Sequence, residues 1–95
     1  MSAASPHRAD VWLDILDRLL GEMIDQQERK LLLLARQVVA DLTAEDLRNP
    51  QDFAPLIRDP AFNYEDGVLA GLRSARMAVR AELHRSRPSP GEPPH

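Results

Sequence analysis

The three histidines are the side chains with the clearest capacity for metal binding or proton transfer, and their spacing favours neither. His7 and His95 lie near the two ends of the chain, whereas His84 stands among arginines. No two histidines are three or four residues apart, the spacing that places two imidazoles on one side of a helix. Glu82 and His84 do not form the Glu-x-x-His pair of helical di-iron proteins, because only one residue separates them. We therefore expect no metal site.

Catalytic and cofactor-binding patterns are missing from the rest of the 95 residues as well. The chain has no cysteine, which excludes disulfides, thiolate zinc sites and cysteine nucleophiles. It has no HExxH, GxGxxG, GxSxG or Walker motif. The acidic stretch over residues 63–67 lacks the alternating oxygen ligands and the closing glutamate of a calcium loop. The sequence predicts a non-catalytic protein without a cofactor.

Charge and hydropathy bear on the class of partner. Twelve basic side chains against fifteen acidic ones give a net charge of -3, which does not favour nucleic acid or an anionic membrane. The longest apolar run, Leu31 to Ala35, is far shorter than the roughly 20 residues of a membrane span. The first residues lack the apolar segment of a secretory signal, so we expect a cytoplasmic protein. Eleven arginines against one lysine predict a GC-rich bacterial genome as its source.

A first helix is predicted over residues 6–42. Its apolar line, with one polar member, consists of Leu13, Leu16, Leu20, Ile24, Gln27, Leu31, Leu34, Val38 and Leu42, at spacings of three and four. Ser5 is the predicted N-cap, with Pro6 at the first helical position. Gly21 is the weakest point of the helix. A helix of about 50 Å is too long for a small globule, so it must belong to an elongated hairpin or a bundle.

A second helix is predicted over residues 64–87, with Asn63 as its N-cap. Its apolar line consists of Val68, Leu72, Ala75, Val79 and Leu83. Residues 1–5 are predicted to be a flexible lead-in. Residues 88–95 hold four prolines and are predicted to form a disordered tail.

The linker over residues 43–63 contains too many large apolar side chains for a free loop: Phe53, Leu56, Ile57 and Phe62. We expect it to fold back and close the end of the hairpin. Within it, Thr43 is predicted to cap a short turn that has Asp46 at its third position.

Each predicted helix carries a stripe of like charge beside its apolar line. The acidic stripe includes Asp14, Asp17, Asp25 and Glu28, and the basic stripe includes Arg73, Arg76, Arg80 and Arg87. When each residue is placed around its helix at about 100° per residue, both stripes are displaced from their apolar lines in the same rotational direction. Only antiparallel packing then brings the two stripes together. The charges therefore predict an antiparallel hairpin, whose orientation and register they set.

The two helices have more apolar and small-residue surface than one hairpin covers. The first carries a second apolar flank, and the second carries a wide surface of small side chains. The predicted interface consists of Trp12, Leu19, Met23, Leu33, Gly71, Ala75 and Ala78. A helix that is apolar on several sides needs more than one neighbour. We expect a homodimer that forms a four-helix bundle, the alternatives being a different protein partner or a self-sufficient monomer.

Two smaller features stay open at this stage. Gln27 interrupts the apolar line, either as a tolerated polar residue at a wet level or as a register-setting pair across a dimer axis. Phe62 and Tyr64 either pack onto the first helix or form a corner that docks a partner. The sequence does not distinguish an intrachain hairpin from a domain-swapped one.

The sequence thus predicts an all-α fold, a long antiparallel hairpin with a proline-rich closing linker, dimerising into a four-helix bundle. The predicted function is assembly, adaptor or regulatory work through protein–protein contacts. The alternative is a nucleic-acid-associated protein that uses the Arg73–Arg87 basic surface.

Overall fold

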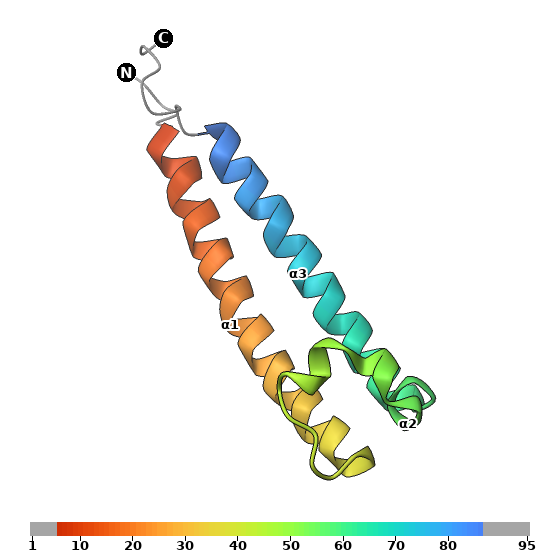
Figure 1. The fold of residues 1–95 in the computed structure, drawn as a ribbon. Helices are drawn as coiled ribbons and strands as arrows, with labels where there is room; N and C mark the ends of the chain where they lie inside the picture. Colours follow the sequence, from red (N-terminus) through yellow and green to blue (C-terminus); the bar gives the residue numbers. More distant parts are fainter. Residues whose placement is uncertain (1–5, 87–95) are drawn as a thin grey trace.

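The computed structural model describes residues 6–86 and is an antiparallel helical hairpin (Figure 1). Two long helices, α1 (Pro6–Val38) and α3 (Pro60–Ser86), lie side by side along their length. The connection contains two 3₁₀ turns, η1 (Asp46–Arg48) and η2 (Pro50–Asp52), and one short helix, α2 (Ala54–Ile57). Within residues 6–86 there is no strand. The all-α hairpin predicted from the sequence is therefore confirmed. Ser5, Arg87 and the predicted tail lie outside the described residues.

Helix α1 ends at Val38, four residues before the predicted end at Leu42. The chain turns there, and the Arg36 side chain donates from Nε to the Leu42 carbonyl oxygen at 2.8 Å. This bond satisfies a carbonyl just beyond the helix end, which would otherwise lack a backbone donor. Leu42 still reaches the core and is almost fully buried, because the turn folds it back against α1.

Helix α3 begins at Pro60, so the prediction of Asn63 as its N-cap is wrong. Asp59 is the cap instead: its Oδ2 accepts a hydrogen bond from the backbone N–H of Phe62 at 2.8 Å. Pro60 occupies the first helical position, where its missing N–H costs nothing. The Asn63 side chain donates to the Ile57 carbonyl oxygen at 2.9 Å. The earlier start places Phe62 in the first turn of α3, where it is buried.

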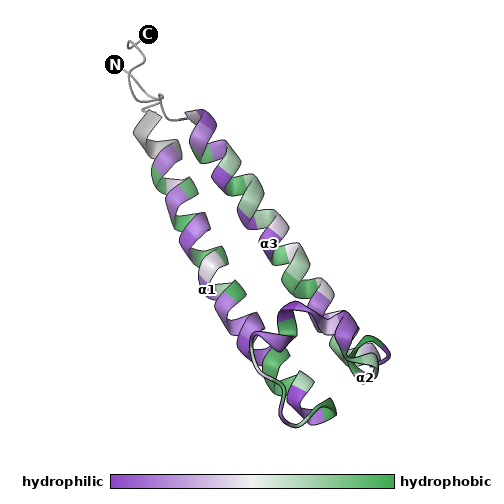
Figure 2. Cartoon of the chain, in the orientation of Figure 1, coloured by the Kyte–Doolittle hydropathy of each residue, from purple (hydrophilic) through white to green (hydrophobic). Residues whose placement is uncertain are grey.

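The linker closes the hairpin end as expected. Thr43 and Asp46 bond reciprocally, each side chain accepting from the other's backbone N–H at 3.0–3.1 Å. Leu56 is fully buried, and Phe53 packs against the same core as Phe62. Ile57 differs, because it remains about half exposed. Figure 2 shows the hydrophobic residues of this closing segment next to the lower turns of α1 and α3.

The seam between α1 and α3 keeps most of the predicted apolar lines buried or half-buried, but leaves Leu16 and Ala75 exposed. The buried positions of α1 include Gly21, Ile24, Leu31 and Ala35, and those of α3 are Phe62, Leu69 and Leu83. At 100° per residue, the mean direction of these fully buried positions lies about 50–70° from the predicted lines, toward the charged stripes, and several of them belong to the core that the linker closes. Each apolar line is consequently split between the seam and an open surface.

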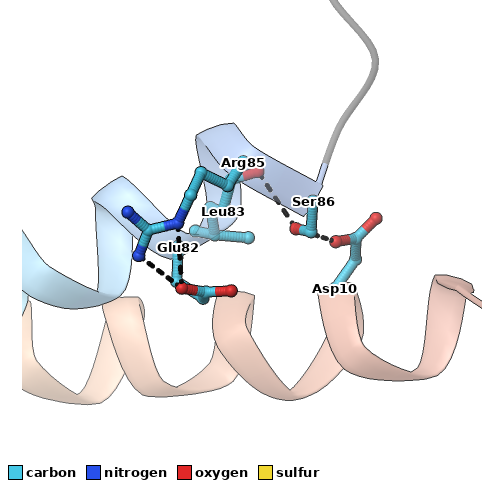
Figure 3. Close-up of polar contacts among 5 residues, drawn as sticks. All are labelled: Asp10, Glu82, Leu83, Arg85 and Ser86. Atoms are coloured by element: carbon cyan, nitrogen blue, oxygen red, sulfur yellow. Dashed lines mark hydrogen bonds and ion pairs between the residues drawn. The ribbon is translucent and has the colours of Figure 1, made fainter.

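The open end of the hairpin is joined by polar contacts (Figure 3). The Ser86 hydroxyl donates to Asp10 Oδ1 at 2.7 Å, which connects the last turn of α3 to the beginning of α1. Within α3, Arg85 donates from two nitrogens to Glu82 Oε1. Asp10 and Ser86 thus lie at the same level of the hairpin.

The capping assignment predicts that Asp59→Ala lowers the free energy of unfolding by about 1 kcal/mol, because the amide of Phe62 loses its acceptor. Asn63→Ala is the matched control and should change stability by no more than about 0.5 kcal/mol, since its bond is exposed. Urea denaturation followed by circular dichroism measures both. A larger loss for Asn63→Ala than for Asp59→Ala would contradict the observed helix start.

Candidate interaction surface

Asp17 is the centre of the ionic contacts between α1 and α3. Its Oδ1 accepts from Arg76 Nε at 3.0 Å and from Arg80 Nε at 2.9 Å. Asp17 and Arg76 are mostly withdrawn from solvent, with side chains only 22% and 28% exposed. The hydrogen bond from Arg76 is the main cause that holds the pKa of Asp17 below its ordinary value, with Arg80 adding to it against partial burial. The carboxylate therefore joins two turns of α3 to one point of α1.

Gly21 makes room for this ion pair. A Cβ atom at this position would lie 2.9 Å from the Arg76 guanidinium carbon, closer than real Cβ contacts allow. Gly21 is buried although it lies in the acidic stripe. Because Gly21 has no side chain, the Arg76 guanidinium can lie directly over its Cα and reach Asp17 one turn away.

Other members of the predicted stripes meet as the antiparallel arrangement requires. Arg73 donates to Glu28 at 2.5 Å, in an exposed pair. Exposed pairs of this kind contribute about 0–1 kcal/mol each, so they select orientation and register more than they stabilise. We call the surface formed by Asp17, Glu28, Arg73, Arg76 and Arg80 the charged face.

Two further residues of the predicted acidic stripe line cavities on this side of the hairpin. Asp25 lines a cavity of about 360 Å³ between α1, η1 and α3 on the charged face. Asp14 lies near His84 in a shallower pocket toward the open end. Arg87 lies outside the described residues.

Gln27 is part-buried and bonded within the hairpin. Its Nε2 donates to the Glu65 carbonyl oxygen at 2.9 Å and to Glu65 Oε1 at 2.8 Å. Lys30 pairs with the other carboxylate oxygen of Glu65 at 3.1 Å. The Gln27 bond first, and Lys30 second, hold the pKa of Glu65 below its ordinary value. Both donor hydrogens of the Gln27 amide are thus used to connect α1 to α3 of the same chain.

The opposite side of α1 carries a row of large apolar side chains that residues 6–86 leave about half exposed. Trp12 is 61% exposed, Leu16 and Leu19 are each 45% exposed, and Met23 is 48% exposed. Their spacings of four, three and four place them within about 60° on the helix, the pattern of a coiled-coil seam. Helical periodicity predicted that Leu16 lies in the hairpin seam. That prediction is wrong, because the rotated seam leaves Leu16 among the open residues.

Helix α3 presents small side chains on the same side of the hairpin. Gly71, Ala75 and Ala78 are exposed, and the space above Gly71 is open for at least 4 Å. Measured around each helix from its side of the seam, these residues are displaced in the same rotational direction on α3 as the Trp12–Met23 row is on α1. In an antiparallel pair, two surfaces displaced in the same rotational direction lie on the same face of the hairpin. The arginines of α3 and the acids of α1 share the opposite face for the same reason. We call these seven residues, Trp12, Leu16, Leu19, Met23, Gly71, Ala75 and Ala78, the apolar face.

The docking corner predicted from Phe62 and Tyr64 is divided by the structure. Phe62 is only 1% exposed and belongs to the core, so its assignment to a docking surface is wrong. Tyr64 is 70% exposed and lies on the side of α3 that carries Ala75. The physical reason is the early start of α3, which puts these two residues on different sides of its first turns.

A groove of about 530 Å³ continues the apolar face toward the linker end. Leu33, Leu34 and Ala61 provide its apolar lining, and Lys30 and Gln37 are among its polar residues. Leu33, a predicted interface residue, is 64% exposed here. The groove was not predicted, because it arises only where α1 and α3 lie side by side.

Comparisons of the chain with protein-family models, with curated proteins and with solved structures found no match. Among residues 6–86, no three His, Cys, Asp or Glu side chains gather in a way that could hold a metal ion. No helix in this described part has the length and apolar character that crossing a bilayer requires. The apolar face is therefore the feature on which a functional proposal rests.

The space that Gly21 provides predicts a measurable coupling to Arg76. In an Arg76→Ala background, Gly21→Ala should raise the free energy of unfolding by about 1 kcal/mol through helix propensity. In the wild-type background the gain should be smaller, because the new methyl group displaces the guanidinium from Asp17. Urea denaturation of the four proteins of this double-mutant cycle gives the difference. Equal gains in both backgrounds would show that Arg76 does not need the space.

The lowered pKa of Asp17 predicts a pH-dependent contribution to stability. A folded-state pKa below the unfolded value stabilises the protein above about pH 4, and this contribution is lost as the pH falls through the folded-state pKa. Asp17→Asn should therefore be less stable than the wild type at pH 7, and the difference should shrink in more acidic solution. Urea denaturation at several pH values measures this. Asp25→Asn is the control, and an equal loss in both variants at pH 7 would contradict the role given to Asp17.

Proposed function

We propose that this chain is a small, non-catalytic cytoplasmic protein that works in assembly, as an adaptor or in regulation, through contacts of its apolar face with protein. The main support for this proposal is a row of four large apolar side chains that lie about half exposed along one side of α1: Trp12, Leu16, Leu19 and Met23. Contiguous apolar surface of this kind marks interaction sites in water-exposed proteins. The linker does not bury it, since these four side chains stay 45–61% exposed.

A second copy of the same hairpin is the partner that we propose for this face, giving a four-helix bundle. Two identical hairpins placed face to face cover both apolar faces at once, as a two-fold dimer requires. Burying the exposed halves of four large side chains contributes on the order of 3–6 kcal/mol per protomer. The polar charged face remains in water on both outer sides of such a dimer.

The alternative, binding of nucleic acid through the arginines of α3, receives less support from the geometry. Arg73, Arg76 and Arg80 each bond to an acid of α1. To bind phosphates they would first have to leave these carboxylates, which also repel the nucleic-acid backbone. The proposal of a protein-binding apolar face does not require any bond of the hairpin to break.

The dimer proposal predicts opposite outcomes for substitutions on the two faces. Leu19→Glu and Ala75→Glu place a charge within the apolar face and should convert the dimer to a monomer, because an unpaired buried carboxylate is costly. Met77→Glu is the matched control, since Met77 is 70% exposed and lies on the other side of α3. Light scattering after size-exclusion chromatography gives the masses.

The wild type and Met77→Glu should both have twice the mass of one chain. Circular dichroism of the monomeric variants should show that the helices are retained. A wild type that is monomeric at all concentrations would eliminate the homodimer, and an unchanged mass for both glutamate variants would eliminate the apolar face as the interface.

A further inference from the structure

We propose, resting on the homodimer above, that its two-fold axis runs parallel to the helices, so that α1 of one protomer lies on α3 of its partner. The large side chains of each α1 would then pack on the small ones of the partner's α3. The same arrangement would place the partner's Tyr64 at the groove beside Leu33. Both placements are argued below from the differences in side-chain size across the apolar face and from the groove beside it.

The first observation is the difference in side-chain size across this face. The α1 half is formed by leucines, a methionine and a tryptophan, whereas Gly71, Ala75 and Ala78 form the α3 half. The Asp10–Ser86 and Asp17–Arg76 bonds set the register within the hairpin. In this register Leu19 is level with Ala75, and Met23 is level with Gly71. At these two levels the hairpin therefore has a raised α1 half and a lowered α3 half, whereas level with Trp12 the α3 half carries the Glu82–Arg85 ion pair.

Two identical hairpins stacked face to face admit two in-plane two-fold axes. With the axis across the helices, α1 lies on the partner's α1, so that raised halves meet on one side and lowered halves on the other. On the side where α1 meets α1, the large side chains would hold the two hairpins far apart. On the side where α3 meets α3, the small side chains would let the hairpins come closer. With the axis parallel to the helices, the raised α1 half of one hairpin meets the lowered α3 half of its partner on both sides. The distance between the two hairpins is then uniform, within the roughly 8–10 Å typical of packed helices.

The second observation is the match between Tyr64 and the groove. Tyr64 is 70% exposed, and the Gln27–Glu65 bonds place it near the level of Lys30 and Leu33. With the axis parallel to the helices, the partner's Tyr64 meets the groove at that level. The groove has an apolar lining for the ring and the polar side chains of Lys30 and Gln37 for the phenol hydroxyl. At this level the large side chain comes from α3 of the partner, and the groove supplies the space that receives it.

This arrangement has a structural consequence. All four neighbouring helix pairs are antiparallel, two within protomers and two between them. Both closing linkers lie at one end of the bundle, and the described ends of α1 and α3 lie at the other. The axis across the helices would instead put one linker at each end.

Disulfide cross-linking tests the axis, and the absence of native cysteine makes it unambiguous. Leu19→Cys and Ala75→Cys are prepared as separate single variants, mixed, and oxidised. Disulfides require Cα atoms within about 7 Å, so neighbouring helices can be joined and diagonal helices cannot. We expect the mixture to give a covalent dimer that joins position 19 of one protomer to position 75 of its partner, and neither variant alone to give one. Met77→Cys mixed with Leu19→Cys is the control and should not cross-link.

Each other outcome has a defined meaning. Cross-linking of Leu19→Cys with itself, or a dimer by light scattering without any disulfide in the mixture, would overturn this axis while leaving the homodimer intact. A monomeric wild type would overturn the dimer and the axis together.

Tyr64→Ala tests the groove. The variant should weaken dimerisation by about tenfold or more, as removal of an aromatic side chain that fills a partner's pocket does, measured by sedimentation equilibrium. Tyr64→Phe should stay within about threefold of the wild type, because most of the contact is with the ring. Met77→Ala is the control on the other side of α3. An unchanged dissociation constant for Tyr64→Ala would overturn the placement of the partner's Tyr64 in the groove.

Discussion

The contact of Arg76 with Asp17 across Gly21 is the constraint on which the rest of the hairpin depends. A guanidinium crosses α1 where a side chain is missing and reaches a carboxylate that also binds Arg80. This ion pair lies on the side of the helix contact toward which the fully buried positions of both helices are shifted. Hydrophobic burial supplies most of the stabilisation, and the charges favour the antiparallel orientation and its register.

The exposed apolar row lies on the side of α1 away from that shift. Had the apolar lines of α1 and α3 met face to face, Leu16 and Ala75 would be in the seam. They are instead open, beside Trp12, Leu19 and Met23. The hairpin thereby separates into a charged face that is satisfied within one chain and an apolar face that is not. This separation of two faces, one for folding and one for contact, is the basis of the proposed dimer.

The closing linker strengthens the same separation. Its core residues, Leu56 and Phe53, together with Phe62 at the start of α3, seal the end of the hairpin. The η1 turn packs on the charged side, where it lines a cavity with α1 and α3. Prolines and the two reciprocal hydrogen bonds between Thr43 and Asp46 restrict this segment without extending it over the apolar face. The groove near Leu33 consequently remains open.

The amino-acid pattern alone was enough to predict the two long helices, their antiparallel orientation and the surplus of apolar surface, because helical periodicity and complementary charge are local and rotational properties. It also contained the capping pair of Thr43 and Asp46. The rotation of the helices about their axes, the start of α3 at Pro60, the burial of Phe62 and the groove emerged only from the packed hairpin. Arg76 lies over the missing side chain of Gly21, and α3 starts where Asp59, and not the predicted Asn63, accepts from the amide of Phe62. Such choices rest on close contacts that periodicity does not encode, many of them between residues far apart in the chain.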